Sequence, residues 1–202
     1  MKAINYVKLI FFIILSSSLM SKAYAESDPI VFLDQITNQV LQEIGKNKED
    51  IESNNAKLFE IVDDIVLPHV DFIEMSKWVA GRTAWGQESR TIKESFVKEF
   101  KILVVNTYAT ALNKYTNERI EFKPIKNTNK KRIQVQSKII RQEKDDVFVD
   151  YRLIAHDNTW KVYDVIIEGI SILQGFRSQF NNDISKHGLE FVTQKIRNHH
   201  NE

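Results

Sequence analysis

One serine of this chain stands in a segment that approaches a catalytic motif. The segment Gly169-Ile170-Ser171-Ile172-Leu173 is similar to the Gly-x-Ser-x-Gly turn that exposes a nucleophilic serine, but Leu173 occupies the place of the second glycine. A serine directly before an apolar helical stripe is typical of a helix N-cap. We therefore expect Ser171 to cap a helix, and we predict no catalytic residue in this segment.

Carboxylates and imidazoles are the other groups that could carry acid–base or metal chemistry. The candidates are Asp63, Asp64, Asp71, Glu74, His69, His156, His187, His199 and His200. No two histidines have the helical spacing of a metal site with a glutamate nearby, and no glycine-rich phosphate loop is present. The acidic residues have the pattern of a solvated helix surface. The sequence thus predicts neither an enzyme nor a metal or cofactor site.

The first 25 residues have the layout of a secretory signal peptide. Lys2 and Lys8 precede an apolar run at 9–15, and Ala23-Tyr24-Ala25 is a cleavage site of the small-x-small type. The run is shorter than the roughly 20 residues that a bilayer span requires. We therefore expect residues 1–25 to be removed and residues 26–202 to form one soluble periplasmic domain.

Charge and cysteine content narrow the class of protein further. The whole chain has 28 basic and 27 acidic residues, and removal of the three lysines of the signal leaves 25 and 27. This balance does not indicate bulk attraction to nucleic acid. Because the chain has no cysteine, no disulfide holds it together, and its stability must come from an ordinary core.

Apolar residues at intervals of three and four predict helices in the first half of the chain and again at its end. The first helix begins at Ser27-Asp28-Pro29, the second ends at Pro68, and a short third ends near Gly81. The longest begins at a capping box of Thr91 and Glu94 and continues toward Tyr115. After the strands, Ser171 begins a helix that Gly188 ends, and a last helix follows.

Between these helices the apolar period changes from 3.6 to 2, which is the period of strands. Four strands are predicted near 119–125, 131–142, 147–155 and 159–168. The links between them are short and polar, so we expect an antiparallel meander. The fold class is therefore α+β, with N-terminal helices, a four-stranded meander and C-terminal helices packed on the sheet. Periodicity cannot distinguish a filled core from one that contains a ligand cavity. Taken alone, the apolar stripes therefore favour the ordinary case, which is a filled core.

The last predicted strand and the helix after it resemble a known family. The chain has Trp160-Lys161-Val162-Tyr163-Asp164-Val165-Ile166-Ile167-Glu168-Gly169-Ile170-Ser171, then Phe176-Arg177-Ser178-Gln179-Phe180. This resembles the MlaC, or toluene-tolerance, family of periplasmic phospholipid-binding proteins. Further matches are Asp71-Phe72, Met75, Gly81, Trp85, Phe96, Phe100, Thr107-Tyr108 and Tyr151. The resemblance covers essentially the whole of residues 26–202.

The resemblance implies a phospholipid carrier of the Mla system, which maintains outer-membrane lipid asymmetry. Its expected partners are an inner-membrane MCE-domain protein (MlaD-like) of an ABC transporter and an outer-membrane lipoprotein (MlaA-like) complex. Its cargo is a bound phospholipid, and no cofactor is implied. The inward sheet face and the apolar helix faces would enclose the acyl chains. The residues expected to line that cavity are Phe72, Met75, Phe100, Leu103, Tyr108, Val147, Val149, Tyr151, Ile167, Ile170 and Phe176.

Headgroup and partner contacts are less marked in the sequence. Arg82 and Arg177 are the basic residues inside matching motifs, and either could equally be a surface or ion-pair residue. The resemblance implies a headgroup mostly in water and a mixture of lipid classes. The segment 118–144 has nine basic and three acidic residues, whereas 43–74 has nine acidic and three basic. These segments would be either docking faces for two partners or plain solvated surfaces.

Three alternatives stay open at this point. The first is a carrier of another lipid, such as a hopanoid or a fatty acid. The second is a small periplasmic hydrolase or isomerase with Tyr163, Asp164 or Asp71 inside the cavity, which a buried carboxylate with a strongly raised pKa would favour. The third is an adaptor protein whose apolar residues are all core.

Overall fold

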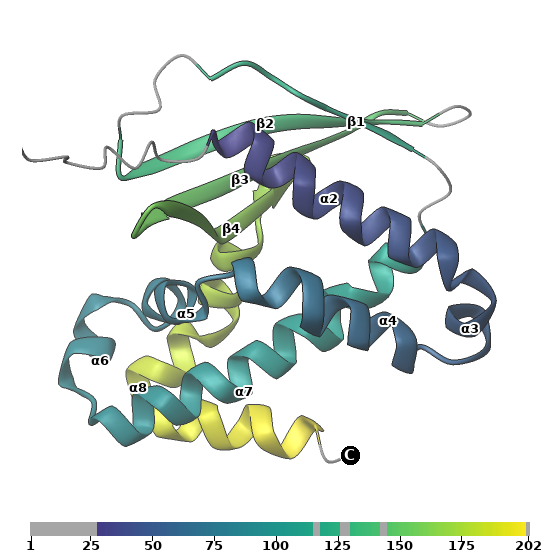
Figure 1. The fold of residues 1–202 in the computed structure, drawn as a ribbon. Helices are drawn as coiled ribbons and strands as arrows, with labels where there is room; N and C mark the ends of the chain where they lie inside the picture. Colours follow the sequence, from purple (N-terminus) through teal and green to yellow (C-terminus); the bar gives the residue numbers. More distant parts are fainter. Residues whose placement is uncertain (1–27, 115–117, 126–129, 142–144, 201–202) are drawn as a thin grey trace, which may run out of the picture.

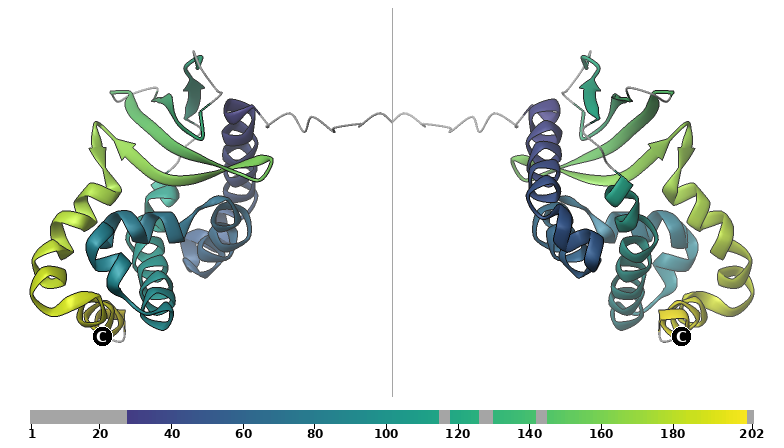
Figure 2. Two further views of the ribbon diagram at one scale, coloured as in Figure 1. Left: turned by 90° about the vertical axis from the view of Figure 1, so that its left-hand side faces the viewer. Right: turned by 90° about the vertical axis from the view of Figure 1, so that its right-hand side faces the viewer.

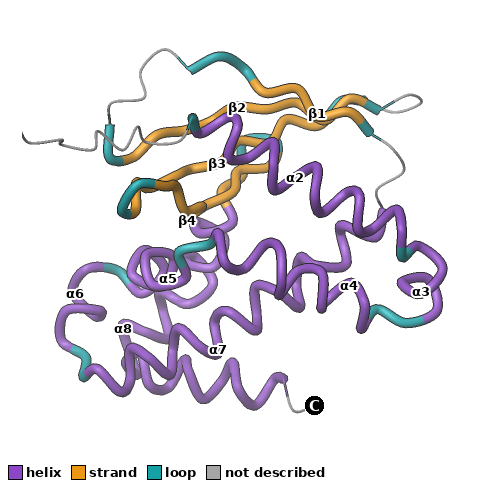
Figure 3. Tube along the Cα trace, viewed as in Figure 1, coloured by secondary structure: helices purple, strands orange, loops and turns teal. Residues whose placement is uncertain are grey.

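The structure is a computed structural model that describes residues 28–114, 118–125, 130–141 and 145–200. The predicted signal peptide at 1–25 lies outside these residues. A curved antiparallel sheet covers a layer of helices (Figures 1 and 3). The helices come before and after the sheet in the chain, so the predicted α+β order is confirmed.

The first described helix, α2 (Pro29–Lys46), begins where its cap was predicted. The Asp28 side chain accepts hydrogen bonds from the backbone N–H groups of Ile30 (2.8 Å) and Val31 (3.3 Å), and Pro29 occupies the first helical turn. Its buried residues are Pro29, Phe32, Leu33, Val40 and Ile44. One face of α2 is therefore apolar and packs inward.

Short helical elements connect α2 to the next long helices. They are α3 (Lys48–Ser53), α4 (Ala56–Ile61), the π-helical η1 (Val62–Val66) and the 3-10 turn η2 (Leu67–His69). The second predicted stripe thus continues across a change of helix type, and its residues Leu58, Ile61, Val62 and Ile65 are all buried. Pro68 lies in η2, where the stripe ends as expected.

Four elements lead from η2 to the sheet: α5 (Phe72–Ala80), α6 (Arg82–Gln87), α7 (Arg90–Tyr108) and η3 (Ala109–Lys114). The predicted capping box at Thr91 and Glu94 is wrong. Ser89 is the N-cap of α7, and its hydroxyl accepts a hydrogen bond from the N–H of Ile92 (3.2 Å). Ser89, two residues before Thr91, has the extended backbone that a cap requires, so Thr91 lies inside the first turn of the helix.

The sheet consists of β1 (Arg119–Phe122), β2 (Arg132–Ile140), β3 (Val147–His156), β4 (Thr159–Ile167) and β5 (Ile170–Ser171), in that spatial order. All pairs are antiparallel, so the predicted meander is confirmed, and β5 adds a short fifth strand. The register places Tyr151 opposite Val135 on one side and Val165 on the other. Figure 2 shows the sheet arching over the helices, with α2 and α8 at opposite sides.

The last described element is α8 (Ile172–His200), which is two helices joined at a kink. The Ser171 hydroxyl accepts a hydrogen bond from the N–H of Gln174 (3.1 Å), which confirms its predicted role as a cap. Gly188 has φ 84° and interrupts the helix, as predicted from the sequence. The two halves are linked by an ion pair between Lys195 and Asp183 (2.8 Å).

Buried apolar side chains form three clusters. The largest, here called the helical core, lies between α5, α7 and α8 and contains Phe96, Phe100, Phe176 and Phe180. A second joins the start of α2 to β2, β3 and β4, and a third joins the rest of α2 to α3, α4 and η1. Because α2 belongs to two clusters, it spans the space between the sheet and the helices.

Candidate functional site

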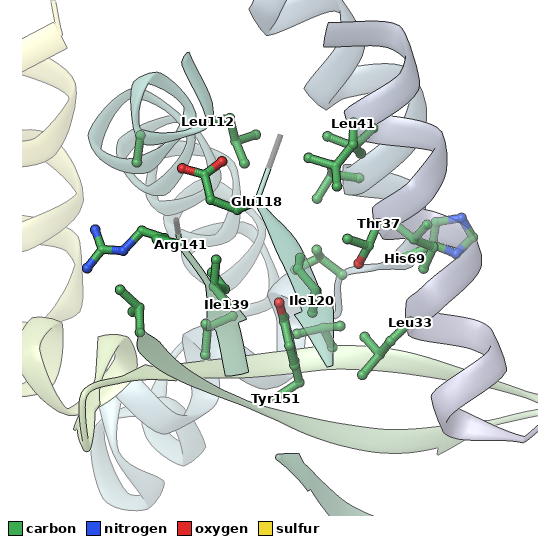
Figure 4. Close-up of a pocket in the computed structure, with 18 residues that line it drawn as sticks. Leu33, Thr37, Leu41, His69, Leu112, Glu118, Ile120, Ile139, Arg141 and Tyr151 are labelled. Carbon is green, nitrogen blue, oxygen red and sulfur yellow. The ribbon is translucent and has the colours of Figure 1, made fainter. Parts of the chain in front are cut away.

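An apolar cavity lies between α2, the inner face of the sheet and the turns η1, η2 and η3. In Figure 4, α2 forms one wall, and the strands that carry Ile120, Ile139 and Tyr151 form the wall beside it. The volume is about 420 Å³, which falls within the roughly 300–1,000 Å³ of sites that enclose small organic ligands.

The lining is dominated by aliphatic side chains. Thirteen of the eighteen lining residues are aliphatic: Leu33, Ile36, Val40, Leu41, Val66, Val70, Ala111, Leu112, Ile120, Ile139, Val147, Val162 and Val165. The other five are Thr37, His69, Glu118, Arg141 and Tyr151. A cavity with this lining offers burial to hydrocarbon and few groups for polar chemistry.

The inner sheet face supplies its part of the lining through strand alternation. Val147, Val149 and Tyr151 lie on one face of β3, as predicted, and Val147 and Tyr151 line the cavity. Val149 is buried between them but is not among the lining residues. It pairs with Ser137, whose buried hydroxyl donates to the carbonyl oxygen of Val149 (2.7 Å). Val149 therefore belongs to the packed interior of the sheet and not to the cavity lining.

Tyr151 places a phenol group among the aliphatic lining residues. Its hydroxyl points into the cavity in Figure 4. Burial raises the pKa of Tyr151 to about 12, so the phenol stays neutral at ordinary pH. Tyr151 therefore adds an uncharged polar group to the lining.

His69 closes the cavity beside α2. Its ring makes an edge-to-face contact with the buried ring of Phe32, with centroids 5.4 Å apart. Burial lowers the pKa of His69, and the positive charge of Lys161 lowers it further. The imidazole is therefore neutral at neutral pH, which suits an apolar lining.

Six predicted lining residues lie in the helical core and not beside the cavity. Met75, Phe100 and Phe176 are buried in it, and Phe72, Leu103 and Tyr108 pack against it. Phe100 meets Phe176 edge-to-face at 5.1 Å, and Tyr108 meets Phe176 at 6.2 Å. None of the six lines the cavity, because α5, α7 and α8 close directly on one another.

Ile167 and Ile170 are paired across β4 and β5 at the edge of the sheet. They are 38% and 72% exposed. Neither isoleucine is among the residues that line the cavity.

The two arginines expected near a headgroup also lie away from the cavity. Arg82 is exposed on α6, and Arg177 is exposed on α8. The Arg177 guanidinium donates to the carbonyl oxygen of Trp78 (3.0 Å) and lies against Gly81, so it ties α8 to the end of α5. Its position is explained by this structural contact.

Sequence reasoning missed most of the cavity lining. The apolar period predicts a buried face on this helix, but nothing in the spacing of Leu33, Ile36 and Val40 shows that part of the face borders a space. The residues of η3, β1 and β2 were not proposed at all. A usable signal was the isolated polar residue Thr37 within the apolar face of α2, since a filled core rarely accepts one.

The residues proposed for catalysis have structural partners. The carboxylate of Asp164 is fully buried and accepts hydrogen bonds from Arg152 (2.9 Å), Ser171 (2.7 Å) and the N–H of Leu173 (3.2 Å). Asp71 caps α5 by accepting from the N–H of Glu74 (2.8 Å).

Tyr163, the third of these candidates, is buried in the helical core with Arg132 over its ring at 5.8 Å. None of the three lines the cavity. Among the described residues, no group of three or more His, Cys, Asp or Glu side chains is arranged to hold a metal ion.

Two further hollows have similar or larger volumes but a different character. One, of about 600 Å³, borders the kinked helix α8 and is lined mostly by exposed side chains, including Phe191. The other, of about 470 Å³, lies beside α5 and includes Lys77, His156 and Lys161. Both are surface grooves. Within the described chain, no helix is both long enough and apolar enough to span a bilayer.

Comparison with known proteins gives consistent matches over most of the chain. The family model described as MlaC protein matches residues 34–198. The intermembrane phospholipid transport system binding protein MlaC of Haemophilus influenzae is 24% identical over 196 residues, covering 95% of this chain and 91% of the relative. The toluene tolerance protein ttg2D of Pseudomonas putida is 29% identical over 152 residues, covering 75% of this chain and 71% of the relative.

A solved structure gives a similar fold. The phospholipid-binding protein from Ralstonia solanacearum, determined in complex with a phospholipid, has a TM-score of 0.77 and 28% sequence identity. The match covers 85% of this chain and 96% of that protein.

Proposed function

The chain belongs to the MlaC family, and on this premise we propose that it is a phospholipid carrier whose cavity encloses acyl chains. The observation that carries the proposal is the lining itself. Thirteen aliphatic side chains, from α2, the sheet, η1, η3 and Val70 after η2, surround one space. The phospholipid held by the Ralstonia relative, a protein of the same fold, supports the same reading.

The cost of moving a phospholipid through water explains why such a cavity is needed. Two acyl chains contain some thirty methylene groups, and about 0.8 kcal/mol for each gives a cost on the order of 20 kcal/mol. Unassisted transfer is therefore negligible. A carrier offsets the cost by replacing water with the side chains of the cavity.

We infer that the protein works without catalysis. The carboxylates that could act as acid or base are used to cap α5 and to fix the start of α8. Ser171, the serine of the segment that approaches a catalytic motif, caps α8 and is not among the lining residues. Lipid would be taken up and released because partners differ in affinity for it.

The proposed route of the lipid crosses the periplasm, between the inner and the outer membrane. The carrier would exchange lipid with an inner-membrane MCE-domain protein of an ABC transporter and with an outer-membrane lipoprotein complex, and so maintain outer-membrane lipid asymmetry. The expected signal peptide and the names of the relatives support this placement.

The two segments of opposite charge are proposed to orient the encounters with these partners. The two segments are in contact, since Arg132 at the start of β2 forms an ion pair with Glu74 on α5.

Native mass spectrometry tests the proposal directly. The protein is exported with its own signal peptide, purified without detergent and weighed intact, and its lipids are then extracted. We expect a mass excess that resolves into phospholipid. If the extracted ligand were a hopanoid or a fatty acid, the protein would be a carrier of that lipid and not of phospholipid. A lipid-free mass, with no lipid gained from liposomes, would overturn the carrier function.

A further inference from the structure

The cavity lining contains two hydroxyl groups, and they come from two different walls. Thr37 is on α2 and Tyr151 is on β3, and no other residue among the eighteen that line the cavity has a hydroxyl. In Figure 4 both oxygen atoms point into the space between α2 and the sheet. Ile36, the neighbour of Thr37, and Tyr151 pack against the same buried cluster, so the two hydroxyls border the same part of the cavity.

The hydroxyl of Thr37 is not used by its own helix. A threonine inside a helix commonly donates to the carbonyl oxygen four residues earlier. Thr107 donates in this way to Leu103 (2.7 Å), and Thr193 donates to Leu189 (2.9 Å). Thr37 is half-buried, and no group of the described residues accepts a hydrogen bond from its hydroxyl. Its proton is therefore available to a molecule in the cavity.

The hydroxyl of Tyr151 is a second neutral donor in this lining. Burial keeps the phenol protonated at ordinary pH, and its polar neighbour in the protein is the hydroxyl of Ser137. Ser137 donates its own proton to the carbonyl oxygen of Val149 (2.7 Å), so it can only accept from the phenol. A ligand oxygen in the cavity can replace Ser137 as the acceptor, because Ser137 then keeps its own hydrogen bond to Val149.

We propose that the hydroxyls of Thr37 and Tyr151 donate to the two ester carbonyl oxygens of the bound phospholipid. This inference rests on the proposed carrier function and adds a site for the glycerol backbone to it. Ester carbonyls are neutral acceptors joined directly to the acyl chains, so neither partner brings a charge into the aliphatic lining. A lipid whose chains are joined by ethers has nearly the same shape but no carbonyl oxygen. The two hydroxyls would therefore favour acyl esters over ethers.

The test uses exported, delipidated protein and vesicles that contain equal amounts of ester-linked and ether-linked phosphatidylethanolamine with chains of the same length. After incubation the protein is separated from the vesicles, and its two lipids are quantified by mass spectrometry. The wild type should take up more of the ester-linked lipid, by about three- to ten-fold. Thr37→Val and Tyr151→Phe should each lower this ratio by about two- to four-fold, and the double variant should bring it close to one.

Matched controls for both changes lie at the end of α7. The hydroxyl of Thr107 is used within the helix, Tyr108 packs against the helical core, and neither residue lines the cavity. Thr107→Val and Tyr108→Phe make the same chemical changes and should keep the wild-type ratio. Thr37→Ser removes a methyl group but keeps the hydroxyl, so it should also keep the preference for the ester. This variant separates loss of the donor from altered packing in the cavity.

The outcomes separate this inference from the carrier function. Equal uptake of the two lipids by the wild type would overturn the ester site and leave the carrier function intact. A preference for the ester that persists unchanged in the double variant would also overturn it, because the selection would then come from other residues. No uptake of either lipid by the wild type would remove both the site and the carrier function.

Discussion

The buried carboxylate of Asp164 accepts a hydrogen bond from the hydroxyl of Ser171 at 2.7 Å, and this contact joins β4 to the start of α8. The same carboxylate accepts from the N–H of Leu173 (3.2 Å), while Ser171 accepts from the N–H of Gln174 (3.1 Å). The first turn of α8 is therefore tied to the sheet by polar contacts in a buried setting. These hydrogen bonds thus connect the sheet, which forms one wall of the cavity, to α8, which belongs to the helical core.

Ser171→Ala should destabilise the protein by about 2 kcal/mol, because it removes a helix cap and a donor to a buried carboxylate. Urea unfolding followed by circular dichroism measures this change. Ser178→Ala, at an exposed serine of the same helix, is the control and should have little effect. Equal unfolding midpoints for the two variants would contradict the role assigned to Asp164.

Two adjacent isoleucines test the cavity. Ile139 lines it, whereas Ile140 lies on the opposite face of β2 and does not. Ile139→Glu should greatly reduce the lipid that copurifies with the protein, because a carboxylate among acyl chains loses its hydration. Ile140→Glu should retain lipid. Mass spectrometry of the intact proteins compares them, and equal lipid content would argue against this lining.

The helical core should behave as packed interior and not as binding surface. Phe100 is fully buried in it, so Phe100→Ala should lower the free energy of unfolding by about 3–5 kcal/mol. Phe191→Ala, at an aromatic residue that is 45% exposed, should cost less than about 1 kcal/mol. A Phe100→Ala protein of wild-type stability that had lost its lipid would instead place Phe100 in the binding site.

The lowered pKa of His69 predicts a pH dependence of stability. Its ordinary value is 6.5, and folding lowers it, so the unfolded chain takes up the proton first as the pH falls. The contribution to stability is therefore complete above pH 6.5 and is lost as the pH falls through the folded-state pKa.

The wild type should accordingly lose more stability below pH 6.5 than His69→Gln does. Denaturant titrations at several pH values measure the difference, with His156→Gln as the control for loss of an exposed imidazole. Parallel curves for the wild type and His69→Gln would show that His69 makes no such contribution.

Gly81 ends α5 with φ 81° and ψ 155°, a conformation that side chains rarely adopt. A Cβ there would also lie 3.4 Å from the guanidinium of Arg177. Gly81→Ala should destabilise by about 1–3 kcal/mol, measured by thermal or urea unfolding. Gly45→Ala, inside α2 with open space around it, should instead stabilise slightly. A neutral Gly81→Ala would mean that the Arg177 contact is dispensable.

Local patterns account for the parts of the fold that the sequence predicted. The caps at Asp28 and Ser171, the breaks at Pro68 and Gly188 and the alternation on β3 depend on neighbouring residues in the chain, and all are confirmed. The error at the start of α7 arose between two equally suitable local caps. Only the path of the preceding chain selects Ser89 over Thr91.

The cavity itself was decided by tertiary structure. The sequence determines that one face of α2 and one face of α7 are apolar, because the period of the helix places those residues together. It does not determine that the α7 face closes on α5 and α8 whereas part of the α2 face borders a cavity. Both outcomes satisfy the same hydrophobic pattern, since burial depends on removal from water and not on which neighbour provides it. The distance between packed elements alone separates core from cavity.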